Sequence, residues 1–301
     1  MCRKSVMLSF LFSLLFVISS AAVAYPKMKG IYINQGTMED LNRLKYLIKE
    51  AKAVGINTFV VDLARVTPHY QKNIALIKSA GIKYVARIVV FPDGGYAPQI
   101  KSREYWAKRA KLVDTAIGFG ADEIQLDYIR YSSKVQPNPQ NAKDVKQVIK
   151  YFKQRTAAHK VPLQIDVFGE VSFKESPRIG QNIKMFADTI DVACPMVYPS
   201  HYAPYQKHSK QPYQTVLTSL EAMKKQFNQH PPFRLNPYIE SSNYHYHLSA
   251  QQRSIYVLAQ IRAVEDANAD GWYVWSPNNQ YDSMFSAVRN KSTLIQKVKF
   301  H

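Results

Sequence analysis

The sequence lacks the short motifs that mark several common enzyme classes, and it is poor in cysteine. Its two cysteines are Cys2 and Cys194. Cys2 lies at the extreme N-terminus, so Cys194 has no partner for an internal disulfide bond. Neither a Gly-x-Ser-x-Gly elbow nor a glycine-rich phosphate loop occurs. These absences argue against a serine esterase and a nucleotide-binding enzyme, and they leave stability to a large hydrophobic core.

Long apolar runs are also absent, except near the N-terminus. Arg3 and Lys4 precede the apolar residues 6–18, and the small residues Ala22-Val-Ala24 follow. This order is typical of a secretory signal peptide. We therefore expect a signal peptide at residues 1–24 and an exported domain at residues 25–301, periplasmic or secreted. An uncleaved membrane anchor is the alternative, and no transmembrane segment is expected after cleavage.

Acidic residues are scarce relative to basic ones: 22 Asp and Glu stand against 40 Lys and Arg, a net charge of +18. Such a charge favours anionic partners. The lysines, however, are spread along helix-like segments, as at Lys108, Lys146 and Lys224, which indicates solvated helix faces. No nucleic-acid-binding motif is present, so no specific nucleic-acid partner is expected.

Strand-like and helix-like segments alternate eight times along the rest of the chain. Several strand-like runs are nearly continuous in Val, Ile and Phe, which is typical of strands covered on both faces. The expected strands are 29–34, 57–64, 83–91, 123–128, 161–168, 191–198, 233–239 and 271–275. The expected helices are 39–54, 70–80, 103–119, 141–159, 177–188, 213–228, 249–268 and 280–297. This alternation predicts right-handed βαβ units and a parallel sheet.

The two kinds of connection differ. Helix-to-strand links are short and marked by glycine, as at Gly55, Gly81 and Gly120, where a left-handed helix cap is expected. Strand-to-helix links are long and rich in aromatic residues. One end of the molecule is thus built for stability and the other for binding, which predicts an α/β fold of one domain, a (β/α)8 TIM barrel. A doubly wound open sheet is the alternative, disfavoured by the missing phosphate fingerprint.

Two of the expected strands end in the same pattern, a glutamine followed two residues later by an aspartate. The pattern is Gln125-Leu-Asp127 on strand four and Gln164-Ile-Asp166 on strand five. Residues two apart share one face of a strand, and neighbouring strands lie about 4.8 Å apart, so the two carboxyl groups could approach to roughly 5–6 Å. Glycoside hydrolysis uses such a pair, one group as acid and one as nucleophile, and a short separation favours the retaining route.

Other ionisable residues follow the same strand ends. Either aspartate could instead cap a helix or pair with Arg87 or Arg130, and Glu170 and Glu240 are reserve candidates for the acid. Since an unpaired charge inside a barrel is unfavourable, we expect a salt bridge between Asp62 and Arg87 that could also orient a sugar hydroxyl. Arg130, just beyond strand four, could hold a carboxylate in place.

Carbohydrate sites also need flat apolar platforms with polar rims. Aromatic and polar residues that could supply them gather after strand six and around strand eight. They are Tyr198, His201, Tyr202, Trp272, Trp275 and Asn278. A metal site has little support, because His245-x-His247 has no companion Cys or carboxylate at ligand spacing.

Six segments of the chain resemble one known family. They are Lys29-Gly-Ile-Tyr-Ile, residues 86–91, residues 122–131, Asp166-Val-Phe-Gly169, residues 195–202 and residues 271–277. Together they resemble the glycoside hydrolase domain family of bacterial exported proteins, and the resemblance covers nearly all of residues 25–301. It implies a TIM barrel distantly related to the α-amylase-type hydrolases. By that analogy Asp127 would be the nucleophile and the strand-five residue, Asp166, the acid.

The sequence therefore predicts an exported, monomeric glycosidase that acts on a polysaccharide and needs no cofactor or metal. Asp127 is expected to be the nucleophile or electrostatic stabiliser and Asp166 the general acid and base. The expected substrate-binding residues are Asp62, Arg87, Tyr128, Arg130, Tyr198, His201, Tyr202, Trp275 and Asn278. A non-catalytic carbohydrate-binding barrel and a transglycosidase with the same residues are the alternatives.

Overall fold

A computed structural model describes residues 27–297, so the signal peptide expected at residues 1–24 lies outside the described residues. Among those described, no helix is both long and apolar enough to cross a membrane. The strands are β1 (Met28–Ile33), β2 (Thr58–Asp62), β3 (Lys83–Val89), β4 (Glu123–Asp127), β5 (Leu163–Phe168), β6 (Val192–Met196), β7 (Arg234–Leu235), β8 (Tyr238–Glu240) and β9 (Gly271–Trp275).

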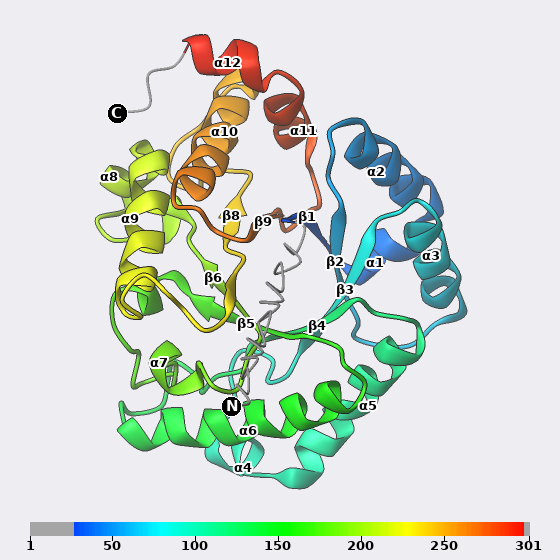
Figure 1. Cartoon of the computed structure of the whole chain (residues 1–301), viewed down its shortest axis with the longest axis vertical. Helices are drawn as coiled ribbons and strands as arrows, with labels where there is room; N and C mark the ends of the chain where they lie inside the picture. The colour runs from blue at the N-terminus through cyan, green and yellow to red at the C-terminus, as the bar shows by residue number, and fades with distance from the viewer. Residues whose placement is uncertain (1–26, 298–301) are drawn as a thin grey trace, which may run out of the picture.

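All strand pairings are parallel, and the sheet closes on itself. The strands β1 to β6 pair in order, β6 pairs with both β7 and β8, and β8 pairs with β9, which returns to β1. The short strands β7 and β8 thus occupy one position, and the barrel has eight positions with helices around it (Figure 1). The predicted TIM barrel is confirmed, and the open sheet is wrong.

The longer helices pack around the barrel, and shorter ones interrupt the loops. The helices are α1 (Gln35–Glu39), α2 (Leu41–Ala53), α3 (Pro68–Ser79), α4 (Ala97–Ile100), α5 (Arg103–Gly118), α6 (Pro139–Ala158), α7 (Ile183–Phe186), α8 (Tyr205–Lys210), α9 (Pro212–Lys225), α10 (Ala250–Asp266), α11 (Asp282–Arg289) and α12 (Lys291–Lys297), with 3-10 turns η1 (Gly169–Ser172) and η2 (Pro199–His201). Several begin at a side-chain cap, as at Thr67 and Ser102. Gly55 and Gly81 follow helix ends at φ +73° and +76°, as expected.

Four expected elements differ from the sequence pattern. The helix expected over 280–297 is two helices, α11 and α12, separated by Asn290. The helix expected over 39–54 is two helices, because Asp40 ends α1 and its carboxylate caps the backbone N–H groups of Asn42 and Arg43 in α2. The helix expected over 177–188 shrinks to α7, because the preceding loop is tied by a bridge between Ser176 and Gln181. Strand seven is split between β7 and β8, where Pro237 has no N–H to donate to a neighbouring strand.

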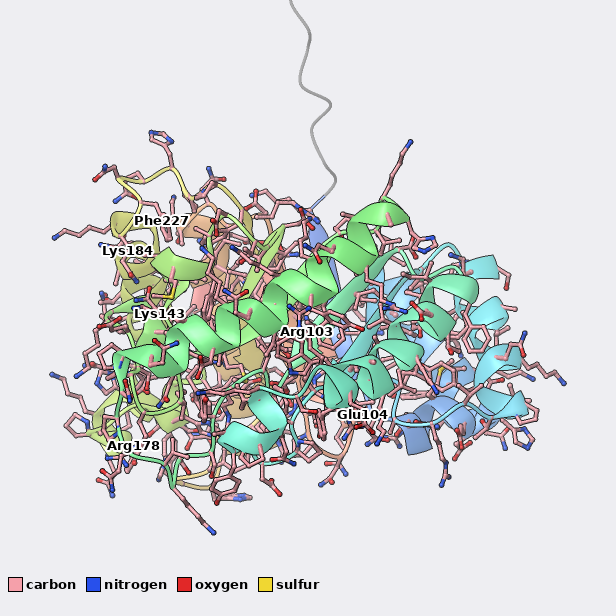
Figure 2. All side chains as sticks on the ribbon, turned by 90° about the horizontal axis from the view of Figure 1, so that it is seen from below. Arg103, Glu104, Lys143, Arg178, Lys184 and Phe227 are labelled. Carbon is pink, nitrogen blue, oxygen red and sulfur yellow. The ribbon has the colours of Figure 1, made fainter. Side chains whose placement is uncertain are left out.

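The core is divided by the sheet. A large apolar cluster fills the space between the strands and the helices, and a smaller one, with Met28, Val60, Val192 and Tyr273, lies inside the barrel. Charged side chains cover the outside: Figure 2 shows Lys143 of α6 and Lys184 of α7 on the outer surface, both exposed. The expected solvation holds for these two lysines but not for all: Lys146 is 18% exposed and pairs with Asp188, and Lys224 donates to the backbone oxygen of Ala267 at 3.0 Å.

Candidate active site

A cavity of about 550 Å³ opens at the carboxyl ends of the strands. Its floor is formed by strand-end residues, among them Arg87, Asp127 and Asp166, and its walls by the long loops that follow the strands. Of the residues predicted for the site, those that line the cavity are Arg87, Asp127, Tyr128, Arg130, Asp166, Glu170, Tyr198, His201, Tyr202 and Trp275. The functional end of a TIM barrel is this end, where eight loops converge.

The register of the sheet brings the two aspartates together. Gln125 of β4 lies opposite Gln164 of β5, and Leu126 lies opposite Ile165, so Asp127 and Asp166 follow at the next matched position. Both glutamines point into the barrel, where Gln125 donates to Gln164 Oε1 at 2.9 Å. The matched glutamines thus fix the spacing beneath the two carboxylates.

A single guanidinium joins three aspartates. Arg87 donates from Nη1 to Asp62 and from Nη2 to Asp127, and its Nε lies 3.5 Å from Asp166 Oδ2. The predicted salt bridge between Asp62 and Arg87 is confirmed, and it extends to both candidate catalytic groups. Three carboxylates around one cation leave a surplus of negative charge in a buried site, which favours protonation of one of them.

Asp166 is the carboxyl group best placed to hold that proton. It is 2% exposed, and its Oδ1 accepts no hydrogen bond from any described residue. Burial, then the charge of Asp127, raises the pKa of Asp166 well above its usual range, against the opposing effect of Arg87. A carboxyl group held in its acid form can donate a proton to a leaving group.

Asp127 has more hydrogen-bond donors around it. Besides Arg87, the backbone N–H of Tyr128 donates to Asp127 Oδ1. Tyr128 adopts φ +51°, a left-handed conformation that is rare for an aromatic residue and turns the chain sharply at the end of β4. The two aspartates therefore have different surroundings, one with an oxygen that no described residue bonds and one held by two donors.

The layer below the aspartates is a hydrogen-bonded network inside the barrel. Tyr238 donates to Gln125 Oε1 at 2.8 Å, and Gln164 donates to Glu123 Oε2 at 2.7 Å. Arg234 donates to both oxygens of Glu123 at 2.9 Å. Because these buried groups satisfy one another, the floor of the cavity is rigid.

Aromatic rings form one wall of the cavity. Tyr198 and Trp275 stack with ring centroids 5.2 Å apart, and His201 packs edge-on against Tyr198 at 5.2 Å. Burial, then the nearby His245, lowers the pKa of His201, which favours the neutral ring. Stacked rings next to polar groups suit the apolar faces and hydroxyl rims of sugars.

Arg130 lies in the opposite wall, but it does not hold a carboxylate as predicted. Its guanidinium lies over the rings of Tyr128 and Phe168, at 5.1 and 5.2 Å, and donates to the backbone oxygen of Tyr131 at 3.0 Å. The left-handed turn at Tyr128 carries Arg130 away from Asp127, and no described carboxylate lies within ion-pairing distance of it. The arginine that pairs with Asp127 is Arg87, from the neighbouring strand.

Three other predicted residues lie outside the cavity. Asp62 lies beside Arg87, its register partner on the neighbouring strand, and accepts a hydrogen bond from Tyr32 Oη at 2.5 Å. Glu240 is fully buried and binds Ser200 and Tyr256, so it anchors η2 instead of facing the cavity. Asn278 is exposed and lines a separate groove. Trp272, also considered from the sequence, belongs to the outer core.

Glu170, the other reserve acid, lies at the rim. It is exposed and accepts a hydrogen bond from Ser176 Oγ at 3.1 Å. Burial raises the pKa of Glu240 to about 7, against the hydrogen bonds from Ser200 and Tyr256. Of the two reserve residues, only Glu170 lines the cavity, and Glu240 is buried beneath η2.

The cavity also contains residues that were not predicted to belong to the site. They are Tyr32, Phe168, Gly169, Gln181, Met196, Ala203, Tyr205 and Tyr238. The period of two along β1 could have placed Tyr32 inside the barrel. Gln181 comes from the loop after η1 and donates to the backbone oxygen of Asp166 at 3.4 Å, a contact with no signal in the local sequence.

No group of three or more His, Cys, Asp or Glu side chains within residues 27–297 is arranged to hold a metal ion. His245, from the His-x-His pair, has its Nε2 against the backbone oxygen of Ser200. Its ring stacks on Tyr205 at 5.0 Å. His245 thus serves as a contact within the loops of the carboxyl end.

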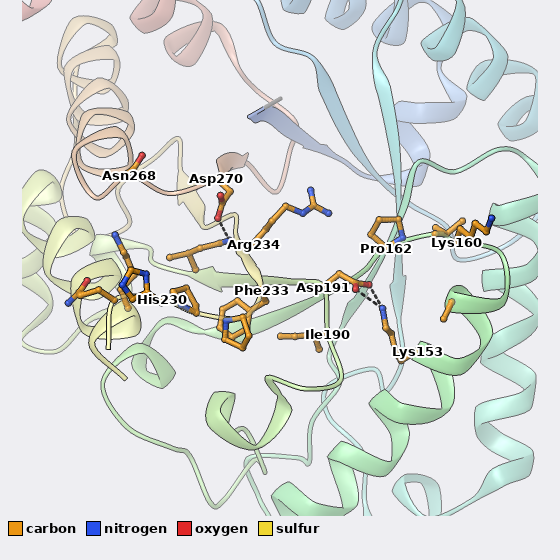
Figure 3. Close-up of a pocket in the computed structure, with 17 residues that line it drawn as sticks. Lys153, Lys160, Pro162, Ile190, Asp191, His230, Phe233, Arg234, Asn268 and Asp270 are labelled. Carbon is orange, nitrogen blue, oxygen red and sulfur yellow. Dashed lines mark hydrogen bonds and ion pairs between the residues drawn. The ribbon is translucent and has the colours of Figure 1, made fainter. Parts of the chain in front are cut away.

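A larger cavity, of about 870 Å³, opens at the other end of the barrel (Figure 3). Several of its charged residues make structural contacts: Lys153 pairs with Asp191, and Asp270 accepts the backbone N–H of Leu235 at 2.7 Å. Arg234, at the same end, pairs with Glu123. The carboxyl end, where the carboxylates outnumber their cation, is the better candidate for chemistry.

Residues 96–281 match the family described as "Putative glycosyl hydrolase domain". No curated protein matches the chain in sequence. Among solved structures, it is similar to a class V chitinase from Pseudomonas fluorescens Pf-5 (13% identity, TM-score 0.62, 88% of this chain and 99% of that one). It is also similar to the endo-beta-1,4-mannanase from Thermotoga petrophila (11%, 0.62, 89% and 77%).

A third similar structure is the spore cortex-lytic enzyme SleL from Bacillus megaterium QM B1551 (8% identity, TM-score 0.60, 90% of this chain and 75% of that one). At such low identities these three structures share the barrel fold with this chain, and the family match is the stronger statement about its class.

Proposed function

The chain belongs to this glycosyl hydrolase family, and on that premise we propose that it is an exported glycosidase that cleaves the O-glycosidic bonds of a polysaccharide. The observation that carries the proposal is the pair Asp127 and Asp166, which reach one guanidinium from adjacent strands at the floor of an aromatic-walled cavity. Export rests on the signal peptide expected at residues 1–24.

In this proposal Asp166 is the general acid. Its raised pKa keeps the proton on the carboxyl group at a higher pH than is usual for an aspartate, so the proton is available for the glycosidic oxygen. As that oxygen accepts the proton, the bond to the anomeric carbon breaks and the leaving sugar departs as an alcohol. Activity should fall as the pH rises through the pKa of Asp166, because the acid is then ionised.

Asp127 is the nucleophile of the proposed reaction. Its oxygen attacks the anomeric carbon and forms a glycosyl ester as the leaving group departs. Asp166, now ionised, takes a proton from water, and the hydroxide oxygen displaces Asp127, which returns as a carboxylate. Two displacements retain the configuration of the sugar. Arg87, bonded to Asp127 and near Asp166, holds both groups in register for these steps.

The walls of the cavity position the sugar. Trp275 and Tyr198 offer a stacked aromatic pair, and the edge of His201 adds a polar group beside it. On the other side, Tyr128 and Arg130 form a second flat surface. Rings on both sides of the aspartates would hold a sugar by its apolar faces and leave its glycosidic oxygen over Asp166.

The test is a panel of glycans incubated with the purified protein, with release of reducing ends as the readout. The panel holds chitin, β-1,4-mannan and isolated spore cortex, suggested by the three similar structures, together with α-linked and uronic polymers. Cleavage by the unaltered protein and its loss in Asp127→Asn would support the proposal. Asp188→Asn, a surface change beside Lys146, is the matched control and should keep full activity.

Two other outcomes would change the proposal. Retention of a glycan without cleavage, equally strong in Asp127→Asn, would make the chain a binding barrel. Cleavage with inversion of the anomeric configuration, seen by NMR on fresh product, would keep the glycosidase and remove the nucleophilic role of Asp127.

A further inference from the structure

A second groove, of about 870 Å³, lies at the carboxyl end of the barrel and has no part in the chemistry described above. Its lining comes from the loop after β8, the start of α10, the loop after β9 and the last two helices, and it includes Ser241, Tyr244, Arg253 and Asn278. These side chains are mostly hydroxyl and amide groups. A polar groove of this kind suits a ligand rich in hydroxyl groups.

Several of its polar groups are not needed by the fold. The exposed side chains of Gln251, Arg253 and Asn278 make no hydrogen bond or ion pair with any residue in the described range 27–297. In the cavity at the amino end, by contrast, Lys153 and Asp191 bond each other. The free donors of this groove are therefore available to an external ligand.

Tyr244 joins this groove to the cavity of the aspartates. It lines the groove and is 48% exposed. Its ring centroid lies 5.6 Å from that of His201 and 6.2 Å from that of Trp275, and both of these residues line the cavity. Ser276, next in the chain to Trp275, lines the groove. The two hollows thus meet along a short row of rings.

We propose that the groove binds further sugar units of the same glycan whose bond is cleaved over Asp127 and Asp166. In this arrangement the glycan leaves the cavity past Trp275, and one of its sugars stacks on the exposed ring of Tyr244. The hydroxyl groups of the glycan then face Asn278, Gln251 and Arg253. The inference rests on the proposed glycosidase function and adds a substrate class to it: a glycan chain longer than the cavity alone can hold.

The experiment measures kcat/KM on labelled oligosaccharides of increasing length, from disaccharide to octasaccharide. They are prepared from whichever glycan of the panel the full-length protein cleaves. We expect kcat/KM to rise with length until the groove is filled. In Tyr244→Ala the ratio of kcat/KM for the longest oligomer to that for the shortest should fall about fivefold, since a stacked ring is lost. Asn278→Ala should lower this ratio by about two- to threefold.

Tyr96→Ala is the matched control, because Tyr96 is also 48% exposed but lies in the loop after β3, outside both hollows. It should leave the ratio unchanged. A ratio that is flat in the unaltered protein, or unchanged in Tyr244→Ala when thermal unfolding shows a folded protein, would overturn the inference and leave the glycosidase proposal intact. Absence of cleavage across the whole panel would instead count against the glycosidase proposal on which the inference depends.

Discussion

The two ends of the barrel differ in how their acidic groups are paired with basic ones. At the amino end Glu123 and Asp191 each pair with one basic group. Arg234 donates to both carboxylate oxygens of Glu123, and Lys153 pairs with Asp191. At the carboxyl end three aspartates share Arg87, and the most buried of them keeps an oxygen that no described residue bonds. Since a surplus of buried carboxyl groups destabilises a fold, its presence at the carboxyl end, in contrast to the paired groups described at the amino end, indicates a function there.

The largest expected effect comes from removing the shared cation. In Arg87→Met the three aspartates face one another without a counter-charge, and we expect the free energy of unfolding at neutral pH to fall by about 3–5 kcal/mol. Chemical denaturation measures the change. Adding Asp127→Asn to Arg87→Met should restore part of the loss, because the negative charge of the nucleophile, which also bonded Arg87, is then gone. Equal stability of Arg87→Met and the unaltered protein would mean that the aspartates do not repel one another in the fold.

A second buried carboxyl group at the same end gives a pH-dependent effect. The pKa of Glu240 rises from 4.5 to about 7 in the folded protein, chiefly through burial. The folded state therefore binds this proton more tightly than the unfolded state. The stabilisation of the folded state by this bound proton is fully present below pH 4.5 and is lost as the pH rises through 7. The free energy of unfolding should fall by about 3 kcal/mol over this range.

The measurement for Glu240 is denaturant unfolding at several pH values between 4 and 8, with Glu240→Gln as the comparison. The glutamine keeps the size of the side chain and cannot ionise, so its stability should vary less over this range. If the two proteins lose stability in parallel, the ionisation of Glu240 is not the cause.

The smallest effect is expected at the amino end. Lys153 and Asp191 are both partly exposed, with side-chain exposures of 29% and 33%, so water screens their interaction. We expect Lys153→Met to lower the free energy of unfolding by about 1 kcal/mol or less, and less still at high salt. If Lys153→Met lowered the free energy of unfolding as much as Arg87→Met does, the proposed difference in charge pairing between the two ends would be wrong.

The sequence was sufficient for the barrel and for the central pair of aspartates. Strand–helix alternation has a clear period, and residues two apart on neighbouring parallel strands come to the same rim, which predicts the placement of Asp127 and Asp166. The contact of Asp62 with Arg87 followed from the same argument, because both lie near the ends of adjacent strands.

The sequence was insufficient where the geometry depends on loops. The left-handed turn at Tyr128 directs Arg130 onto two rings and away from Asp127, and no residue type at that position announces such a turn. Glu240 follows a strand pattern like that of the aspartates, yet the loop with Ser200 folds over it. Asn278, in the loop after β9, lines a separate groove and not the expected cavity, and the strand pattern does not show which way that loop runs.

The most direct test of the charge surplus as a functional feature compares Asp166→Asn with Asp191→Asn, one change at each end. Both proteins are assayed for reducing-end release on the cleaved glycan and for their melting temperature. We predict that Asp166→Asn loses activity by at least about a thousandfold, because the amide has no proton to give to the leaving oxygen. It should melt at the same temperature as the unaltered protein, because a neutral amide of the same size replaces a protonated carboxyl group, and at a higher one where the pH is high enough to ionise Asp166. Asp191→Asn should keep its activity and melt slightly lower. An Asp166→Asn protein that remains active, or that unfolds several degrees earlier, would contradict this claim and make Asp166 a structural residue.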